Sequence, residues 1–550
     1  MKKIIITFLI STLFISCSDN KIIEENSELE KKINQYSKTE LTFDESLLNE
    51  KQKIVVSKLY EAGKIVDRIF LDQVYSKNEE IEDILSKSND PNDKAVLEYF
   101  KINFGPFDRL DHNKPFFGEK NKPAGANFYP EDITKEEFEK FIKDNPEKEA
   151  AFTSEFTVIR RENGKLIAIP YTEYYKTELT EISRLLNEAA NFADNKSLKK
   201  YLTSVAMAFK TNDYYESDMA WMDVDDPTIE VIIGPYEVYE DELFNYKASF
   251  EMFLTLVDPE STEKLKTFAN YLTEMEQNLP IPQEHKNFER GSDSPIVVAQ
   301  EVFSAGDTKA GVQTLAFNLP NDERVRKAKG SKKVMLKNVH QAKFDKLLKP
   351  ISEIVLNQSQ WNFVTFDAFF NHTLMHEMSH GLGPGFIEVD GRKTEAKKEL
   401  KDTYSIMEEC KADILGLFNN QFMIQKGVYP ASFEKEMWVT FLAGVFRSIR
   451  FGINEAHGGG NAIIYNYLLE KGAYEFDSKT QKVRVNFDKA YPALTELANK
   501  VLMIQAKGDY SGAKALLEKY AVSSESIKIL VEKLKVLPVD ITPTFKIEKM

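Results

Sequence analysis

The chain has 550 residues, of which 42% are hydrophobic and 29% are charged. This length and composition indicate a globular protein with a sizeable core, built as roughly two to four domains or as one large body of two lobes. The formal net charge of -15 argues against nucleic acid or an anionic membrane surface as the main partner.

The N-terminus predicts a lipoprotein signal peptide over residues 1–17. A basic start precedes the apolar run Ile4–Ile15, which is too short to span a bilayer. The run ends in Phe-Ile-Ser-Cys, which looks like a bacterial lipobox, so Cys17 would become the acylated first residue. Ser18 is not the aspartate associated with inner-membrane retention, and we expect an outer-membrane location in the cell envelope. The alternative is an ordinary signal peptide with an unrelated cysteine.

Residues 18–40 are polar and acidic, which is typical of a flexible tether between the lipid and the body. No later stretch reaches the length and apolarity of a transmembrane helix, so we expect the lipid to be the only membrane contact.

The body shows helical spacing from Leu41 to about Asn103, then a loop-rich segment to Phe128. Phe156–Arg160 and Leu166–Pro170 flank an Asn-Gly turn and predict a hairpin, and Ile229–Tyr236 predicts a strand that ends in a breaker. Further predicted helices are Thr177–Phe209, Lys247–Met275, Phe433–Arg450 and Ala462–Glu470, and further predicted strands are Pro295–Glu301 and Gln313–Leu319. This mixture indicates a predominantly helical α+β protein.

The chemistry is concentrated in the segment His376-Glu377-Met378-Ser379-His380, an H-E-x-x-H pattern inside the predicted helix Trp361–Leu382. Residues four apart lie on one face of a helix, so His376 and His380 would present two imidazoles to one point. That arrangement suits two ligands of a Zn²⁺ ion, and Glu377 beside them could take a proton from water. If the pattern stood alone, the alternative would be that these side chains only form a solvated helix face.

A second acidic segment strengthens this prediction. Glu408 and Glu409 open an apolar-periodic stretch that runs to Phe418, and Asp413 lies one helical turn after Glu409. Catalytic zinc takes three protein ligands, so Glu409 can be the third, while Asp413 or Glu408 can accept the outer N–H of a ligating histidine. The alternative is that these carboxylates only complement the dipole of a solvated helix start.

Three other segments allow two interpretations each. Cys410 could be a nucleophile, but a small buried core residue is the favoured interpretation. His457 precedes three glycines and could approach a ligand closely or cap a helix, and the clustering of histidines favours a functional role. Glu237 and Tyr239 follow a strand end, where a binding site or a polar turn is possible, and in isolation the turn is favoured.

The two metal-site segments together resemble the dipeptidyl peptidase III family of zinc metallopeptidases, in its branch with the short H-E-x-x-H motif. The family pattern H-E-x-x-H followed by E-E-C-[RK]-A-[ED] matches His376–His380 and Glu408–Asp413. Matching segments also occur in the right order at Gly234–Asp241, at Asn318–Asn321 and at Ala456-His457. The resemblance spans at least residues 229–461.

The resemblance implies roles for the matching positions only. One Zn²⁺ per chain would be bound by His376, His380 and Glu409, with Glu377 activating water and Glu408 orienting a ligating histidine. The resemblance also implies that Tyr239 and His457 stabilise the tetrahedral intermediate. Glu237, Asn318 and Asn321 would bind the peptide.

The resemblance also implies a fold of two lobes about a wide cleft, one helical and zinc-bearing, the other mixed with a small β-barrel. We accordingly predict a mixed lobe over residues 41–257, to which residues 300–345 and the C-terminal tail return. Residues 258–299 and 346–530 would form the helical lobe.

One clear departure from the common family pattern puts substrate preference and catalytic rate in doubt but not zinc binding, and two smaller differences lie in the E-E-C segment. Many members carry one extra residue before the second histidine, whereas this chain keeps plain helical spacing. Lys411 stands where arginine is common, and Asp413 is one methylene shorter than the commoner glutamate.

The sequence therefore predicts a zinc-dependent dipeptidyl peptidase that releases dipeptides from the N-terminus of short peptides. One alternative is an endo-acting zinc oligopeptidase or another amide hydrolase. The other is a surface lipoprotein that binds peptides without turnover, and the intact Glu377 argues against it.

Overall fold

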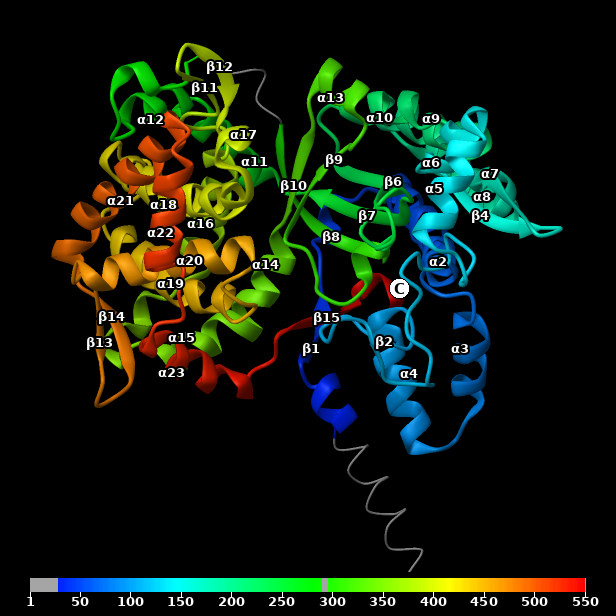
Figure 1. The fold of residues 1–550 in the computed structure, drawn as a ribbon, viewed down its shortest axis with the longest axis horizontal. Helices are drawn as coiled ribbons and strands as arrows, with labels where there is room; N and C mark the ends of the chain where they lie inside the picture. Colours follow the sequence, from blue (N-terminus) through cyan, green and yellow to red (C-terminus); the bar gives the residue numbers. More distant parts are fainter. Residues whose placement is uncertain (1–27, 289–294, 550) are drawn as a thin grey trace, which may run out of the picture.

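The computed structural model describes residues 28–288 and 295–549, so the predicted signal peptide and Cys17 lie outside the described residues. Figure 1 shows two lobes side by side, a helical lobe and a mixed lobe, with strands β8 (Ile296–Gly306) and β10 (Lys332–Leu336) on the side of the mixed lobe that faces the helical one. The predicted class, a predominantly helical α+β protein of two lobes, is confirmed.

The mixed lobe is built on a five-stranded sheet in the order β6-β7-β8-β10-β9. β6 (Ile229–Glu237), β7 (Ser249–Val257) and β8 are antiparallel neighbours, β10 runs parallel to β8, and β9 (Ala316–Leu319) runs antiparallel to β10. Among the described residues no pairing joins the two end strands, so these ladders form an open sheet and do not close the small barrel that the resemblance implies.

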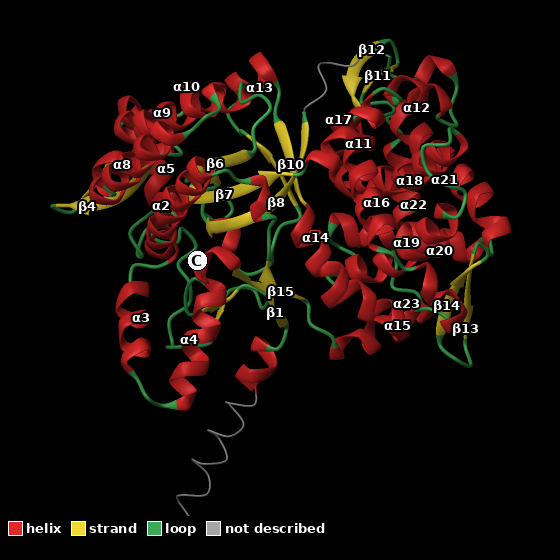
Figure 2. Ribbon diagram, turned by 180° about the vertical axis from the view of Figure 1, so that it is seen from behind, coloured by secondary structure: helices red, strands yellow, loops and turns green. Residues whose placement is uncertain are grey.

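Helices cover this sheet and form the outer part of the lobe (Figure 2). The long α2 (Glu50–Val74) packs against β7 and β8 and begins with a capping box, in which Asn49 and Gln52 satisfy each other's backbone N–H groups. The other helices of this lobe are α3 (Asn78–Lys87), α4 (Pro91–Asn103), α5 (Lys135–Asp144), α6 (Glu149–Thr153), α7 (Tyr171–Tyr174), α8 (Lys176–Phe192), α9 (Lys196–Thr211), α10 (Tyr215–Met222), α13 (Glu323–Lys329) and α14 (Lys337–Lys343). The predicted hairpin is present as β4 (Thr157–Glu162) and β5 (Lys165–Pro170), and a short pair, β2 (Phe107–Asp108) and β3 (Lys114–Pro115), lies in the loop-rich segment.

The prediction of a helix over Lys247–Met275 is wrong in its first half. Residues 249–257 form β7, a central strand in which eight of the nine residues are buried, and only α11 (Pro259–Ala269) and α12 (Leu272–Asn278) are helical. A short continuous apolar run fits a buried strand as well as a buried helix. Pairing with β6 on one side and β8 on the other decides in favour of the strand.

The helical lobe surrounds two long helices that pack against each other, α16 (Phe366–Ser379) and α18 (Tyr404–Gln425). Its other helices are α11, α12, α15 (Lys349–Val355), α17 (Ala396–Leu400), α19 (Phe433–Ile449), α20 (Ala456–Glu470), α21 (Phe487–Lys507), α22 (Tyr510–Tyr520) and α23 (Glu525–Lys533). Two hairpins, β11 (Phe386–Val389) with β12 (Arg392–Glu395) and β13 (Tyr474–Asp477) with β14 (Lys482–Val485), lie at its periphery.

Two large hydrophobic cores correspond to the two lobes. One contains α2, α8, α9 and most of the five-stranded sheet, and the other contains the helices from α15 to α23 together with α11 and α12. Strand β10 borders both, because Val334 and Leu336 lie in the first core while Met335 lies in the second. The proposed lobe boundaries near residues 257 and 345 stay a prediction.

The last strand returns to the mixed lobe. β15 (Asp540–Phe545) pairs in parallel with β1 (Tyr36–Leu41), which places the first and the last strand of the described chain side by side. The tether predicted over residues 18–40 is therefore too long, because Tyr36 and Thr39 are buried in this pair. A short, mostly polar segment gave too weak a local signal for a strand that forms with a partner from the far end of the chain.

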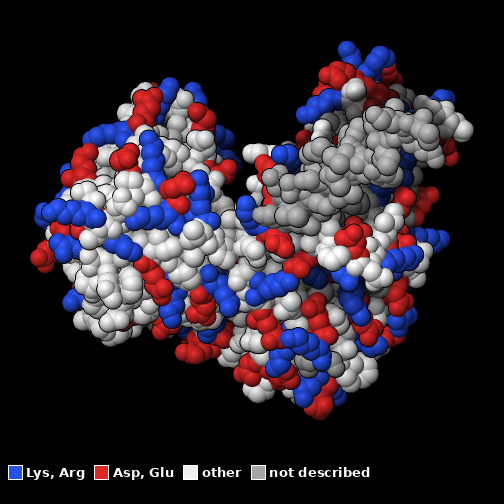
Figure 3. Space-filling model, turned by 90° about the horizontal axis from the view of Figure 1, so that it is seen from below, with Lys and Arg blue, Asp and Glu red and all other residues white. Residues whose placement is uncertain are grey.

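Lys and Arg side chains are interspersed with Asp and Glu over the face of the molecule seen in Figure 3. Among the described residues, no helix is both long and apolar enough to cross a lipid bilayer.

Candidate metal centre and active site

Helix α16 carries the H-E-x-x-H segment. Thr365 caps its start by accepting a hydrogen bond from the Ala368 N–H, and the buried Leu374 and Met375 fix the helix against the lobe core. The last regular helical residue is Ser379, but His380 keeps right-handed helical dihedrals (φ -59°, ψ -33°) as the C-cap. The two histidines therefore retain the predicted one-turn spacing.

Two glycines let the neighbouring helices approach this segment. A Cβ on Gly416 of α18 would lie 2.9 Å from the ring of His372 and 3.4 Å from the backbone N of His376. A Cβ on Gly460 of α20 would lie 2.9 Å from the backbone N of Cys410. The three helices thus cross at the level of the predicted ligands, which explains Gly460, the last of the three glycines after His457.

Three potential ligand atoms converge where these helices meet. Glu409 Oε2 lies 3.3 Å from His376 Nε2 and 3.9 Å from His380 Nε2, and one ligand atom from each of the three residues falls within 4.8 Å of the others. These are the three residues that the sequence predicted as metal ligands.

The outer nitrogens of both histidines are held by carboxylates. The Nδ1–H of His376 donates to Asp413 Oδ1 at 2.8 Å, and the Nδ1–H of His380 donates to Glu408 Oε1 at 2.9 Å. Because a carboxylate can only accept, each ring keeps a proton on Nδ1 and presents Nε2 to Glu409 as its possible ligand atom. Burial opposes the charge of Glu408, but Lys411 and the His380 ring outweigh it and lower the pKa of this carboxyl to about 2.

The donor set fits a divalent cation such as zinc. Glu409 Oε2 is buried and has no hydrogen-bond partner among the described residues, although three imidazole nitrogens surround it. A tetrahedral ion that holds its ligands at about 2.1 Å keeps them about 3.4 Å apart, close to the spacing seen here. A second possible group, His372, His376 and Asp413, fits less well because Asp413 already accepts the His376 N–H.

Glu377 points away from these ligands toward the mixed lobe. Its Oε2 forms an ion pair with Nζ of Lys333 on β10, and both side chains are largely buried, with 19% and 17% exposed. Burial raises the pKa of Glu377, but the charges of His376 and Lys333 outweigh it, so the net shift is downward and the carboxylate stays ionised.

His457 lies in the first turn of α20, and its side chain is 62% exposed. Its Nδ1 is 3.1 Å from Glu409 Oε2, and its ring centroid is 5.8 Å from that of His376. Glu455, not His457, is the N-cap of α20. Of the two sequence interpretations, the structure therefore places His457 beside the ligand cluster rather than at a helix cap.

The predicted peptide-binding residues lie on or beside β6 and β9, the two end strands of the mixed-lobe sheet. Asn321 donates to the Tyr236 carbonyl at 3.1 Å and to Glu237 Oε1 at 3.4 Å, so the end of β6 and the segment after β9 are joined. Burial raises the pKa of Glu237, although the Asn321 hydrogen bond opposes this shift. Asn318 is exposed on β9, and Tyr239 is 77% exposed without a recorded contact to the histidine cluster within the described residues.

Sequence reasoning missed several residues that support the cluster. Lys333 was missed because β10 was not predicted, and Asn461, which donates to Asp413 Oδ2 at 2.9 Å, directly follows the glycines without a distinct signal of its own. Gln505 of α21 donates to Glu408 Oε2 at 2.9 Å and is remote in sequence. Lys411, which lies 2.8 Å from Glu408 Oε1, could have been found from its spacing one helical turn after Glu408.

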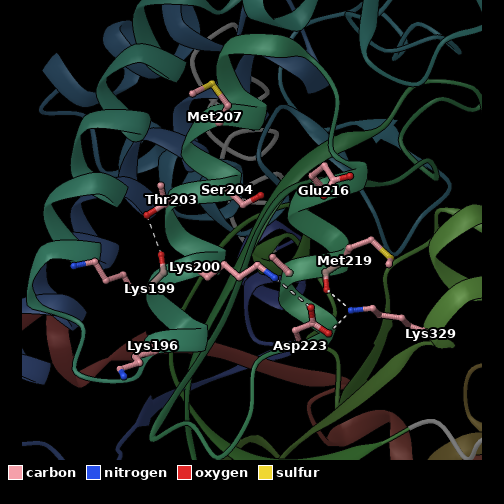
Figure 4. A pocket seen from close by; sticks show the side chains of 11 residues that line it. Lys196, Lys199, Lys200, Thr203, Ser204, Met207, Glu216, Met219, Asp223 and Lys329 are labelled. Carbon is pink, nitrogen blue, oxygen red and sulfur yellow. Dashed lines mark hydrogen bonds and ion pairs between the residues drawn. The ribbon is translucent and has the colours of Figure 1, made fainter.

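Two other features lie apart from this chemistry. Cys410 is fully buried, burial raises the pKa of its thiol, and it is a core residue as favoured from the sequence. A hollow of about 710 Å³ between α9, α10 and α13 is lined by lysines, two of which pair with Asp223 (Figure 4). None of the predicted site residues lies on these helices.

Comparisons with known proteins agree with the site. Residues 132–401, which include the H-E-x-x-H segment, match the model of peptidase family M49. The structure of DPP III from Caldithrix abyssi is 68% identical, with a TM-score of 0.92 over 94% of this chain and 99% of that one. The structure of dipeptidyl-peptidase III from Corallococcus sp. strain EGB is 42% identical, with a TM-score of 0.78 over 95% of this chain and 98% of that one.

A curated plant relative, Nudix hydrolase 3 of Arabidopsis thaliana, is 40% identical over 94% of this chain and 74% of its own length. Its name describes the plant protein, whereas the family model and both solved structures indicate a peptidase. On these grounds, and with the two histidines and the glutamate brought together as a metal-binding set, the chain belongs to peptidase family M49, the dipeptidyl peptidase III metallopeptidases.

Proposed function

We propose that this chain binds one Zn²⁺ ion through His376, His380 and Glu409 and releases dipeptides from the free N-terminus of short peptides. The observation that carries the proposal is the convergence of the two Nε2 atoms on Glu409 Oε2, while Asp413 and Glu408 hold the outer nitrogens. When bound, the ion would supply Lewis-acid polarisation of an oxygen ligand.

Glu377 is the proposed general base. Its Oε2 is held by Lys333, and its Oε1 makes no hydrogen bond to the protein within the described residues, which leaves that atom for the attacking water. The carboxylate takes a proton from this water and then delivers it to the nitrogen of the leaving amine. Its ionised state at neutral pH suits the first of these transfers.

The remaining predicted residues orient the peptide. His457, beside the ligand cluster, and Tyr239 would donate hydrogen bonds to the scissile carbonyl oxygen as its negative charge grows. Glu237 would pair with the free ammonium group of the peptide, and Asn318 and Asn321 would bind its backbone. A carboxylate held at a fixed place beside the sheet edge favours cleavage at a fixed distance from the amino end, which supports an exopeptidase over an endo-acting enzyme.

Paired measurements of zinc content and dipeptide release from a dipeptidyl-naphthylamide test the proposal. Glu377→Ala should keep about one zinc per chain and lose roughly 10²–10⁴-fold in turnover, as loss of a general base does. His376→Ala should lose both metal and activity. Asp367→Ala, an exposed position on the same helix, is the matched control and should lose neither.

N-terminally acetylated peptides separate the exopeptidase from the endo-acting alternative. Acetylation removes the charge that Glu237 is proposed to bind, so blocked peptides should not be cleaved while their unblocked partners are. Equal cleavage of both would favour the oligopeptidase. Folded Glu377→Ala protein with wild-type turnover would remove the general-base assignment.

A further inference from the structure

The contact between Lys333 and Glu377 joins the two lobes at the reacting carboxylate. Lys333 lies on β10 of the mixed-lobe sheet, whereas Glu377 lies on α16 in the core of the helical lobe. Both partners are largely buried, so the ion pair is shielded from the solvent screening that weakens exposed pairs. No other lysine or arginine forms a recorded ion pair with Glu377 within the described residues.

The alternation of a strand explains why this lysine reaches the site and its neighbour does not. Successive side chains on β10 point to opposite faces of the sheet. Lys332 points into the mixed lobe, where its Nζ lies 3.3 Å from Glu230 and 3.0 Å from the Trp221 carbonyl. Lys333 shares the other face with Met335, which belongs to the helical-lobe core. The lysine beside Glu377 is therefore directed there by the pleat of β10.

The same register links Lys333 to a proposed substrate contact. In the antiparallel pair of β10 with β9, Lys333 is directly opposite Asn318. Opposite residues of such a pair project to the same face of the sheet. Lys333 thus stands between the exposed Asn318, on the edge strand that is proposed to bind the peptide, and the carboxylate that is proposed to activate water.

We propose that Lys333 is a positioning residue for the peptidase reaction, which holds the Glu377 carboxylate by Oε2 from the opposite lobe and leaves Oε1 for the attacking water. This inference rests on the proposed function. The general base is then correctly oriented only when the peptide-binding edge of the sheet lies against α16. The Lys333 side chain thus couples the position of the bound peptide to proton transfer by Glu377.

Steady-state kinetics on Lys333→Met and Lys333→Arg test the role. We expect Lys333→Met to lower kcat by about 10–100-fold, the usual effect of removing an outer contact at a metal site, with KM within about twofold and zinc content unchanged. Lys333→Arg keeps the charge and reach and should recover most of kcat. Lys337→Met is the matched control. Lys337 follows β10 directly, and its loss removes a 3.0 Å ion pair to Asp258 without affecting a contact of Glu377.

Carbodiimide cross-linking gives a readout that does not depend on activity. The reagent activates a carboxylate, which a neighbouring amine attacks to form an amide, so the wild-type protein should yield a peptide pair joined between Lys333 and Glu377. Lys333→Met should not yield it, and Lys337→Met should.

The outcomes separate the two proposals. A wild-type cross-link together with unchanged kcat in Lys333→Met would overturn the positioning role alone, as would a loss confined to KM, to zinc content or to stability. A missing wild-type cross-link would refute the contact itself. A zinc-loaded wild-type protein that releases no dipeptides would defeat the proposed function and this inference with it.

Discussion

The substitution Gly460→Ala examines whether close packing of α20 on α18 holds the metal centre together. The new Cβ would lie 2.9 Å from the Cys410 backbone N and 3.2 Å from its Cα, and neither backbone atom can rotate away. Overpacking of this kind costs about 1–3 kcal/mol, and about 1 kcal/mol of it is offset because alanine favours a helix over glycine. We expect a net loss of up to about 2 kcal/mol in the free energy of unfolding.

The same displacement should weaken metal binding. Asn461 follows Gly460 and donates to Asp413, which in turn holds the His376 ring, so a shift of α20 disturbs a contact behind one ligand. We expect zinc affinity to fall by about 10-fold or more, as it does when such outer contacts are lost. Competition with a chromogenic chelator measures this affinity, and urea unfolding followed by circular dichroism measures stability.

Gly444→Ala is the matched control. Gly444 also lies inside a helix, α19, but a Cβ at this position would meet no atom within 4 Å, so alanine should be neutral or stabilising by up to about 1 kcal/mol. Zinc affinity should not change. If Gly460→Ala and Gly444→Ala behave alike in both assays, the close crossing of α18 and α20 does not support the site and the reasoning fails.

Three further outcomes are expected. Glu409→Ala should lose most bound zinc, whereas Glu408→Ala should weaken zinc binding by about 10–100-fold. Metal analysis after dialysis measures both, and a larger loss of zinc in Glu408→Ala than in Glu409→Ala would exchange the roles of the two residues. Burial raises the pKa of Asp218 from 3.8 to about 7, although the Tyr236 hydrogen bond opposes this shift. The stability gained from the protonated, buried carboxyl is therefore complete below pH 3.8 and is lost as pH rises through 7. Asp218→Asn should flatten the decline in unfolding free energy between about pH 4 and 7, and an unchanged slope would contradict the assignment. Cys17 is predicted to carry lipid at the mature N-terminus, which intact-mass measurement checks, and a mature N-terminus elsewhere would refute the anchor.

The sequence alone was sufficient wherever the signal was local. One helical turn separates His376 from His380 and Glu409 from Asp413, so the shared face of each pair follows from helix geometry whatever surrounds it. Several helices, among them α8, α9, α16, α18 and α19, and the β4–β5 hairpin were predicted for the same reason, since caps, turn residues and apolar spacing act over a few neighbouring residues. The resemblance to the family rested on these same local segments.

Tertiary structure decided whatever depends on partners distant in the chain. The apolar run of β7 became a strand because β6 and β8 pair with it, β1 formed only because the C-terminal β15 returns to it, and β10 lies between two strands that were predicted without it. The pleat of β10 then determined which of two adjacent lysines meets Glu377. Sequence periodicity describes how one element distributes its own side chains, whereas the charge beside a catalytic carboxylate is set by which elements pack together.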